Sequence, residues 1–399
     1  MLRFCKYILS AFAIIAVSSC TMVNRESKVE EVYQNTKTGD VLRIQQTSKA
    51  MRSKEGNESR VALLLPLTGE NALLGRHMLD ATQLAMFDLK ADNIHLVPID
   101  TASGTDYIKE KLDTEQPDLI LGPLYAADAK AIHAYASSNN ICMISFSNDK
   151  DLAGKDCLFL LGVMPDESVK RIAKYAMNKH LPDINGVLPK NKYGQTIEAG
   201  LASLNKSSEQ SVKIIGRYNP ATIKEDLKQV NANIAHYAKA DTTLLVPEGG
   251  NNLREFVTDL RGTKGGKKVK YLGSGLWEDE KLHDIPELNG AWFASAPRND
   301  RQSFEKRFEE NFNYKPSKLS SLAYDGIALI AALSQKGIDR SSFNKASITN
   351  SAGFKGITGI FRFKSNGTNQ RAMAVYEIRN DGFLEIDPAP QSFASVDYD

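Results

Sequence analysis

The side chains best suited to catalysis do not occur at catalytic spacings in this sequence. Its 6 histidines are scattered singly, and none falls in the H-E-x-x-H pattern that brings two imidazoles to one zinc ion. No C-x-x-C pair and no G-x-S-x-G nucleophile turn is present. The turn between Gly69 and Gly75 has the spacing of neither a dinucleotide fingerprint nor a phosphate-binding loop. We therefore predict no catalytic residues, no metal site and no cofactor, and we do not expect an enzyme.

Charge and composition argue against a nucleic-acid partner. The chain has 399 residues, with 50 Lys and Arg against 48 Asp and Glu, so its formal net charge is only +2. A basic run at Lys264, Lys267, Lys268 and Lys270 has no interleaved aromatic residues, and we interpret it as a solvated loop rather than a phosphate-binding patch. The length and the 42% hydrophobic content predict a soluble globular chain of two lobes or domains.

The N-terminus has the form of an export signal. Arg3 and Lys6 precede an uncharged apolar run over 7–17, which is shorter than the roughly 20 residues that span a bilayer. The run ends in Val17-Ser18-Ser19-Cys20, which resembles the lipobox of bacterial lipoproteins, although Leu is more usual than Val at its first position. We predict a signal peptide over 1–19 and lipidation of Cys20. The alternative is a plain secretory signal with an incidental cysteine.

The residues after the predicted lipidation site indicate a tether and a destination. The segment 20–59 is polar and lacks a helical or strand period, which favours a flexible, lipid-anchored tether. Thr21, a residue other than Asp directly after the cysteine, resembles an outer-membrane address. We therefore expect a periplasmic protein anchored by lipid in the cell envelope, at the outer membrane.

Two cysteines remain in the body of the chain. Cys142 and Cys157 stand at the starts of two apolar, strand-like runs, 141–146 and 157–163. An exported protein can oxidise such a pair to a disulfide. Two buried free thiols are the alternative, because cysteine is often a small core residue.

Hydrophobic periodicity from residue 60 onward alternates between strand and helix. Repeated units of this kind form parallel sheets that helices cover on both faces. Near the C-terminus, Asn366-Gly367 predicts a hairpin between strands at 359–364 and 372–378. Further strands are predicted at 61–67, 95–100, 118–124, 141–146, 184–188, 212–216, 242–246, 269–273 and 290–294, and helices at 74–89, 126–138, 166–179, 222–239, 251–261, 319–334 and from residue 193.

Several segments resemble the type I periplasmic binding proteins of the leucine-binding class. The segment 61–69 resembles their opening strand and turn, and 122–124 and 144–149 resemble their second and third ligand loops. The segment 191–194 resembles the strand-end Tyr-Gly whose tyrosine enters the cleft, and 322–326 resembles the Tyr-Asp at the start of a later helix. These segments follow the family's order along most of the chain.

The resemblance implies an α/β fold of two Rossmann-like lobes with parallel sheets, joined by a three-segment hinge. It places an N-lobe at 60–163 and 298–345, a C-lobe at 164–297 and 346–385, and a tail at 386–399. Ligands of such sheets lie beyond the carboxyl ends of the strands, so a ligand would bind in the cleft between the lobes.

The resemblance also implies a small polar, amino-acid-like ligand. Its carboxylate would need hydroxyl and N–H donors, for which Ser145, Ser147 and the backbone of Ala126 and Ala127 are the candidates. Leucine-binding relatives carry a serine near the last position, and one lost charge-assisted hydrogen bond costs about 1.5–3 kcal/mol. The alanines therefore weaken the amino-acid interpretation.

The remaining ligand candidates each have a structural alternative. Glu248 is the candidate for the ligand's ammonium group, or else a solvent-facing turn residue. Tyr193 would stack on the ligand or hydrogen-bond to it, or else pack between strand and helix. Trp277 would line the cleft or lie in the core. Asp325 would contact the ligand or cap a helix.

Three other segments, 162–167, 272–277 and 359–363, resemble the lipoproteins called penicillin-binding protein activators. In that group a lipoprotein contacts a peptidoglycan synthase and stimulates it. Two functions follow from the two resemblances. The first is a receptor that presents a ligand to an ABC importer or a sensor. The second is a regulator that docks a penicillin-binding protein.

Overall fold

The computed structural model describes residues 58–181, 183–208, 210–237, 242–261, 269–335, 337 and 340–395. The predicted signal peptide 1–19, Cys20 and nearly all of the predicted tether lie outside the described residues, as does most of the basic run at 264–270. Among the described helices, none is both long enough and apolar enough to cross a bilayer.

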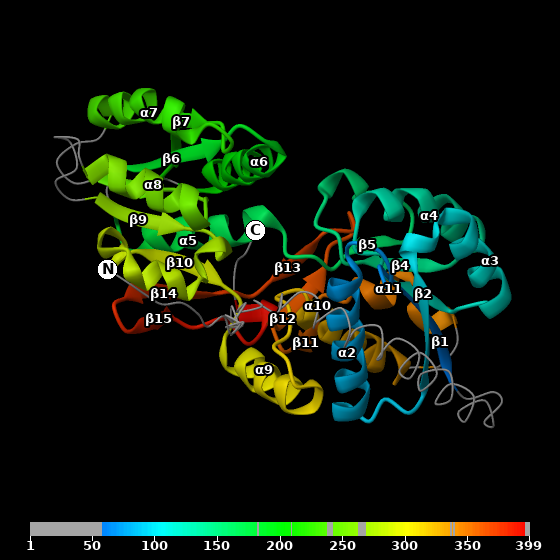
Figure 1. The fold of residues 1–399 in the computed structure, drawn as a ribbon. Helices are drawn as coiled ribbons and strands as arrows, with labels where there is room; N and C mark the ends of the chain where they lie inside the picture. Colours follow the sequence, from blue (N-terminus) through cyan, green and yellow to red (C-terminus); the bar gives the residue numbers. More distant parts are fainter. Residues whose placement is uncertain are drawn as a thin grey trace, which may run out of the picture. The chain divides into compact units, whose positions relative to one another are not determined.

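The N-lobe is built on a fully parallel, five-stranded sheet, sheet A, with the order β2-β1-β3-β4-β5 (Figure 1). Apart from the edge strand β2, its strands are mostly apolar and buried, as for β1, where all five residues from Val61 to Leu65 are fully buried. The strands are β1 (Ser59–Leu65), β2 (Ile94–Asp100), β3 (Leu119–Leu121), β4 (Cys142–Ser145) and β5 (Leu158–Leu160), and the helices between them are α2 (Ala72–Asp88), α3 (Thr105–Glu115) and α4 (Ala126–Ser138).

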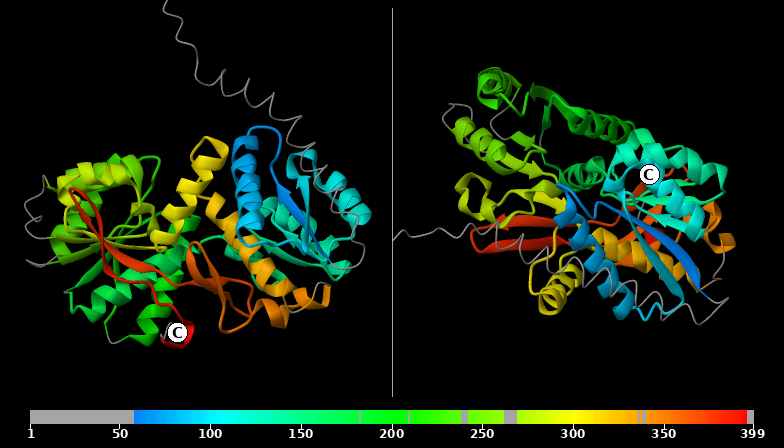
Figure 2. Two further views of the ribbon diagram at one scale, coloured as in Figure 1. Left: turned by 90° about the horizontal axis from the view of Figure 1, so that it is seen from below. Right: turned by 45° about the vertical axis from the view of Figure 1, so that its right-hand side comes forward.

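The C-lobe contains a seven-stranded sheet, sheet B, with the order β15-β14-β10-β9-β8-β6-β7. Five strands are parallel: β6 (Ile184–Pro189), β7 (Lys213–Tyr218), β8 (Thr242–Leu245), β9 (Val269–Gly273) and β10 (Trp292–Ser295). The hairpin of β14 (Ala374–Arg379) and β15 (Gly382–Asp387) adds antiparallel to β10, which makes the sheet mixed rather than parallel throughout. The helices are α5 (Pro165–Asn178), α6 (Lys192–Ser207), α7 (Ile223–Tyr237) and α8 (Gly250–Arg261), and they cover both faces of the sheet (Figure 2).

A third, antiparallel sheet, sheet C, completes the N-lobe. It consists of β11 (Phe354–Gly356), β12 (Gly359–Phe363) and β13 (Asn369–Arg371). β11 packs on α10 (Ser320–Ser334), and the Leu160 N–H of β5 donates to the Gly367 carbonyl at 2.8 Å. The helices α9 (Asn299–Phe312) and α10 pack on α2, and the short α11 (Lys345–Ile348) precedes sheet C.

The chain crosses between the lobes three times, as the three-segment hinge predicts. The first crossing is 161–164, between β5 and α5; the second is 296–298, between β10 and α9; and the third is 372–373, between β13 and β14. The fold is therefore the predicted α/β arrangement of two lobes.

The last hundred residues differ from the sequence prediction in detail. The Asn366-Gly367 turn joins β12 to β13 at 369–371, whereas the predicted partner strand 372–378 leaves the hairpin and enters sheet B as β14. The segment 346–385, predicted to lie in the C-lobe, is thus divided between sheet C and sheet B. The predicted tail also differs, since β15 extends to Asp387 and Phe393 is only 5% exposed in the C-lobe core.

The structure joins Cys142 and Cys157 in a disulfide, with their Cα atoms 4.8 Å apart. The two cysteines come together because β4 and β5 are neighbouring parallel strands, with Met143 opposite Leu158. The bond joins the start of β4 to the residue before β5, so β4 and the segment 146–157 form one closed ring.

Candidate functional site

Residues that follow β6, β8 and β9 form one polar cluster in the C-lobe. The Tyr193 hydroxyl lies 3.0 Å from the Ser274 hydroxyl. The Tyr218 hydroxyl donates to Glu248 Oε2 at 2.7 Å, and the Gly249 N–H donates to Glu248 Oε1 at 3.0 Å. These groups converge because parallel strands end at the same edge of a sheet. The structure therefore brings together two of the predicted ligand residues, Tyr193 and Glu248.

The cluster is partly desolvated and carries one negative group. Burial raises the pKa of Tyr193 to about 12; the hydrogen bond with Ser274 opposes this shift and the charge of Glu248 adds to it. Burial, with the Glu248 charge, also raises the pKa of Tyr218. Both phenols are thus neutral near pH 7. Glu248 is half-buried and has no ion-pair partner among the residues described here, so the cluster presents an acceptor for a cationic or N–H donor group.

Trp277 differs from its predicted position in the cleft. Its side chain is fully buried, and its indole N–H donates to the Glu248 carbonyl at 2.8 Å. The ring also lies against Gly273, where an added Cβ would come within 1.9 Å of it. Trp277 is therefore a core residue that fixes the backbone of Glu248, which is the alternative role expected from the sequence.

The two predicted serines of the N-lobe are used inside the turn that follows β4. Ser145 is fully buried; its hydroxyl donates to the Pro123 carbonyl at 2.8 Å and accepts from the Ser147 N–H at 3.1 Å. Ser147 is 7% exposed, and its hydroxyl accepts from the Asp149 N–H at 3.1 Å. The Ser145 hydroxyl donates within the turn and not to a ligand carboxylate, contrary to the prediction. The Ser147 hydroxyl only accepts within the turn, so its proton can still be donated, and its role as a carboxylate donor stays a prediction.

The other predicted donors of the N-lobe lie at the start of α4. Ala126 is the first residue of the helix and is half-buried, and Ala127 is exposed. The residue before them, Tyr125, makes no side-chain capping hydrogen bond to the first turn. The first N–H groups of a helix lack partners within the helix, so these amides retain the donor capacity predicted for them.

Asp325 is fully buried inside α10 and is neither a helix cap nor exposed to a ligand. Its carboxylate accepts from the Ile357 N–H at 2.8 Å and from the Thr358 hydroxyl, and it pairs with Arg371 Nη1 at 3.1 Å. Arg371 also donates to the Leu161 carbonyl at 2.8 Å. The predicted ligand residue therefore joins α10, sheet C and the first crossing, and so belongs to the hinge.

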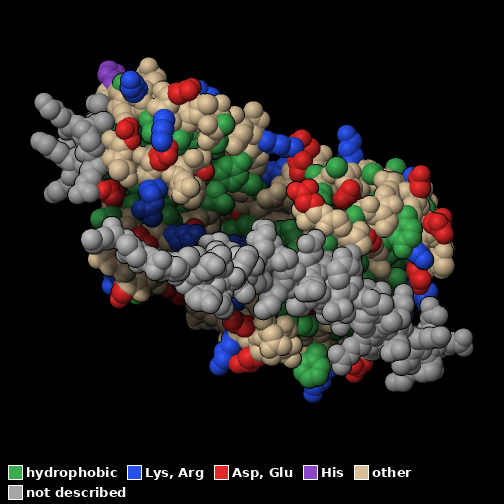
Figure 3. All heavy atoms as spheres, viewed as in Figure 1, with side chains coloured by type: hydrophobic (Ala, Val, Ile, Leu, Met, Phe, Trp, Pro, Cys, Tyr) green, Lys and Arg blue, Asp and Glu red, His purple; other side chains and the backbone are tan. Residues whose placement is uncertain are grey.

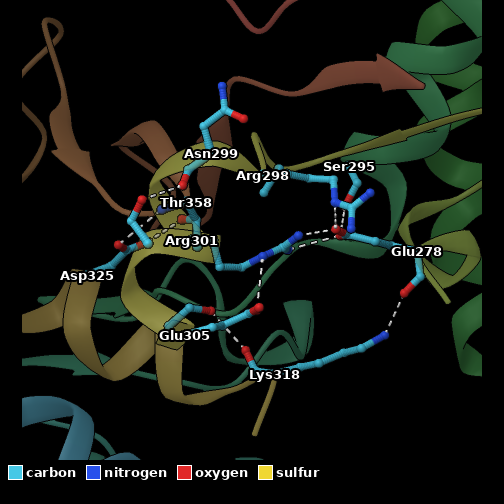
Figure 4. Close-up of polar contacts among 12 residues, drawn as sticks. Glu278, Ser295, Arg298, Asn299, Arg301, Glu305, Lys318, Asp325 and Thr358 are labelled. Atoms are coloured by element: carbon cyan, nitrogen blue, oxygen red, sulfur yellow. Dashed lines mark hydrogen bonds and ion pairs between the residues drawn. The ribbon is translucent and has the colours of Figure 1, made fainter. Parts of the chain in front are cut away.

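A second hinge cluster, centred on Glu278, was not predicted from the sequence. Figure 4 shows Arg301 and Lys318 directed toward Glu278, which follows β9. Glu278 accepts from the Ser295 hydroxyl at 2.7 Å and from Arg301 Nη1 at 3.0 Å, and Arg298 Nε lies 3.3 Å away. Lys318 Nζ donates to the Glu278 carbonyl at 2.9 Å. The cluster joins the C-lobe to the helices beyond the second crossing.

The sequence contains only a weak signal for this cluster. Arg298 and Arg301 are three positions apart where α9 begins, so they share a helix face. Charged residues on a helix face are usually solvated, and nothing in the local pattern indicates a carboxylate from a distant strand end. In the part of the chain that the structure describes, no group of three or more His, Cys, Asp or Glu side chains could hold a metal ion.

Comparison with known proteins identifies a family for most of the two-lobed part. The model of the family described as "Periplasmic binding protein" matches residues 58–382. The uncharacterized protein RP748 of Rickettsia prowazekii (strain Madrid E) is 28% identical over 232 residues, which cover 56% of this chain. The match spans 62% of RP748, which is less than two thirds of that relative's length.

Solved structures share the fold at low sequence identity. A protein of Rhodospirillum rubrum assigned to a branched-chain amino acid ABC transporter has a TM-score of 0.71 at 17% identity, covering 82% of this chain and all 100% of that one. Full-length LpoA of Haemophilus influenzae has a TM-score of 0.66 at 17% identity, covering 84% of this chain and 60% of that one. Its C-domain, described as a regulator of PBP1A, has a TM-score of 0.66 at 17% identity, covering 82% of this chain and 100% of that one.

Proposed function

Because the chain belongs to the periplasmic binding protein family, we propose that it is a non-enzymatic envelope protein that binds a small polar, amino-acid-like ligand between its lobes. The bound ligand would be presented to an ABC-type amino-acid importer or to a sensor. The ligand would lie against the carboxyl ends of the strands of both sheets.

The cluster around Glu248 supports this proposal most directly. Its carboxylate is half-buried, is oriented by the Tyr218 hydroxyl and the Gly249 N–H, and has no cation beside it among the described residues. A ligand ammonium would supply the missing charge, and the Tyr193 and Ser274 hydroxyls would accept or donate hydrogen bonds beside it. In this proposal Glu248 selects for an amine and Tyr193 orients it.

The carboxylate of the ligand would have fewer donors than the sequence suggested. With the Ser145 hydroxyl donating within the turn, the Ser147 hydroxyl and the backbone amides of Ala126 and Ala127 at the start of α4 are the candidate donors that remain. One missing charge-assisted hydrogen bond weakens affinity about ten- to hundredfold. We therefore propose that the preferred ligand depends more on its amine than on its carboxylate.

A thermal-shift panel tests the proposal. The full chain is heated with amino acids, simple amines and peptidoglycan fragments, and a ligand at about a hundred times its Kd adds about 2.7 kcal/mol of stability. Glu248→Gln should then weaken an amine ligand at least tenfold. Glu255→Gln serves as the matched control, because it removes the same charge from α8, where Glu255 pairs with Lys224. Unchanged affinity in Glu248→Gln would remove Glu248 from the site.

The alternative is a penicillin-binding protein activator that docks and regulates a peptidoglycan synthase. The internal use of the Ser145 hydroxyl favours it, because the cleft then lacks one of its predicted carboxylate donors. The fold shared with the C-domain of LpoA, described as a regulator of PBP1A, is compatible with it. If no compound shifts the melting temperature while a purified peptidoglycan synthase co-precipitates with the chain, the receptor proposal fails and the activator replaces it.

A further inference from the structure

The loop 146–157 is fastened to the N-lobe at several points. The disulfide holds its C-terminal end, because it joins Cys157 to Cys142, the first residue of β4. Leu152 is 3% exposed and packs in the N-lobe core, and the Gly154 N–H donates to the Asn366 carbonyl at 2.7 Å in the turn of sheet C. The loop therefore has a defined position relative to sheet A.

Three consecutive charged residues of this loop contact the C-lobe. Asp149 and Asp151 each place a carboxylate oxygen 2.6 Å from Nζ of Lys192, where α6 begins. Between them, Lys150 Nζ lies 2.6 Å from Asp166 near the start of α5. Figure 3 shows basic and acidic side chains meeting between the lobes at the upper side of this view. Because the signs alternate, one short loop contacts two helices of the opposite lobe.

The two contacts differ in their exposure to solvent. The side chain of Asp166 is 3% exposed; burial acts to raise its pKa, but Lys170 and Lys150 outweigh burial and lower it. The side chains of Lys192 and Asp151 are 56% and 78% exposed. Salt screens exposed charges much more than buried ones. The Lys150 contact should therefore persist in salt, whereas the Lys192 contact should weaken.

The same loop also contacts the hinge and the candidate site. The Asn148 side-chain amide donates to the Val163 carbonyl at 3.2 Å, in the first crossing. Lys192 directly precedes Tyr193, whose hydroxyl belongs to the polar cluster of the C-lobe. A change in the conformation of the loop would thus act on the first crossing between the lobes and on the proposed ligand site.

We propose that the loop 146–157, held at its C-terminal end by the disulfide, is an electrostatic latch that holds the two lobes together without a ligand. The Lys150–Asp166 pair is its permanent part, and the pairing of Lys192 with Asp149 and Asp151 is its releasable part. The inference goes beyond the proposed function, because it concerns the equilibrium between lobe arrangements and needs no ligand.

The test measures lobe separation in the full chain. Keto amino acids placed at Lys130 on α4 and Ala202 on α6, both exposed, carry two dyes for single-molecule energy transfer. Lys192→Met, which keeps the apolar stem and removes the charge, should raise the ratio of open to closed molecules about two- to fivefold at low salt. Lys190→Met is the matched control, because Lys190 pairs with Asp226 inside the C-lobe and should leave the ratio unchanged.

Salt and a second substitution make the test specific. Raising salt to about 1 M should move the wild-type distribution toward that of Lys192→Met and leave the variant itself unmoved. The double variant Asp151→Asn and Lys192→Met should raise the open-to-closed ratio by less than the product of the two single-variant effects. The reason is that both substitutions remove the same ion pair. The latch is refuted if Lys192→Met matches Lys190→Met, or if salt leaves the wild-type distribution in place. Neither result depends on whether the ligand panel succeeds.

Discussion

Substitution of Arg371 by Met should destabilise the protein more than any surface charge change. Arg371 and Asp325 are 1% and 0% exposed in their side chains, and their ion pair at 3.1 Å lies between α10 and sheet C. Removing the cation leaves a buried carboxylate with only the Ile357 N–H and the Thr358 hydroxyl as strong donors. Breaking a buried pair in this way costs about 3–5 kcal/mol.

The same substitution should make stability depend on pH. Burial raises the pKa of Asp325 already in the wild type, and pairing with Arg371 opposes that shift. Without Arg371 the folded-state pKa rises further above the unfolded value of about 3.9. An acid with a raised folded pKa contributes its stability below the unfolded pKa and loses it as pH rises through the folded pKa. The cost of Arg371→Met relative to the wild type should therefore be smaller near pH 4 than near pH 7, by about 1.4 kcal/mol per unit by which the substitution raises the folded-state pKa of Asp325.

Urea denaturation followed by circular dichroism from pH 4 to pH 8 measures both effects. Arg379→Met is the matched control, because Arg379 is half exposed in its pair with Glu377 and such surface pairs contribute at most about 1 kcal/mol. Asp325→Asn combined with Arg371→Met should recover part of the loss, since no buried charge is then left unpaired. A cost for Arg371→Met no larger than that of Arg379→Met, or a cost relative to the wild type that shrinks as pH rises, would refute the reasoning.

Three further predictions concern other parts of the chain. Replacing Cys142 and Cys157 by Ala should lower the unfolding free energy by about 3 kcal/mol in urea denaturation, because the disulfide restricts the unfolded chain; an unchanged midpoint would contradict this. Gly273→Ala should lower the melting temperature and cost about 1–3 kcal/mol, because its Cβ would overlap the Trp277 ring, and a melting temperature at the wild-type value would show that the ring moves freely. Cys20→Ser should abolish metabolic labelling with a radioactive fatty acid, and label retained by the variant would remove Cys20 as the anchor.

Hydrophobic periodicity was sufficient to predict most strands and helices of the two lobes. The predicted strand 184–188 is β6 at Ile184–Pro189, and the predicted helix 319–334 is α10 at Ser320–Ser334. These patterns are local, because burial on one or two faces imposes a period on consecutive residues. Sheet C was harder to predict, since β13 (Asn369–Arg371) is a buried strand of polar residues. Its side chains can be buried because carbonyl groups far away in the sequence accept their hydrogen bonds.

The candidate site was also predictable only in part. The sequence places Tyr193 and Glu248 after parallel strands, which is enough to predict that they lie on one sheet edge. The sequence does not predict the orientation of a hydroxyl. Ser145 turns inward because its hydroxyl donates to the carbonyl of Pro123, on a neighbouring loop, at 2.8 Å. No spacing within the chain indicates that carbonyl.

By itself, then, the sequence determined the order of strands and helices, the two-lobed family fold and the edge at which polar residues gather, because these follow from the period of apolar side chains and the direction of the strands. Only the tertiary structure decided which polar groups neutralise one another. Asp325 and Arg371 are 46 positions apart, and Lys192 and Asp149 are 43 positions apart. Charges this far apart in the sequence become partners only when separate helices and strands pack together. The sequence pattern does not contain the distances in space that decide which charges meet.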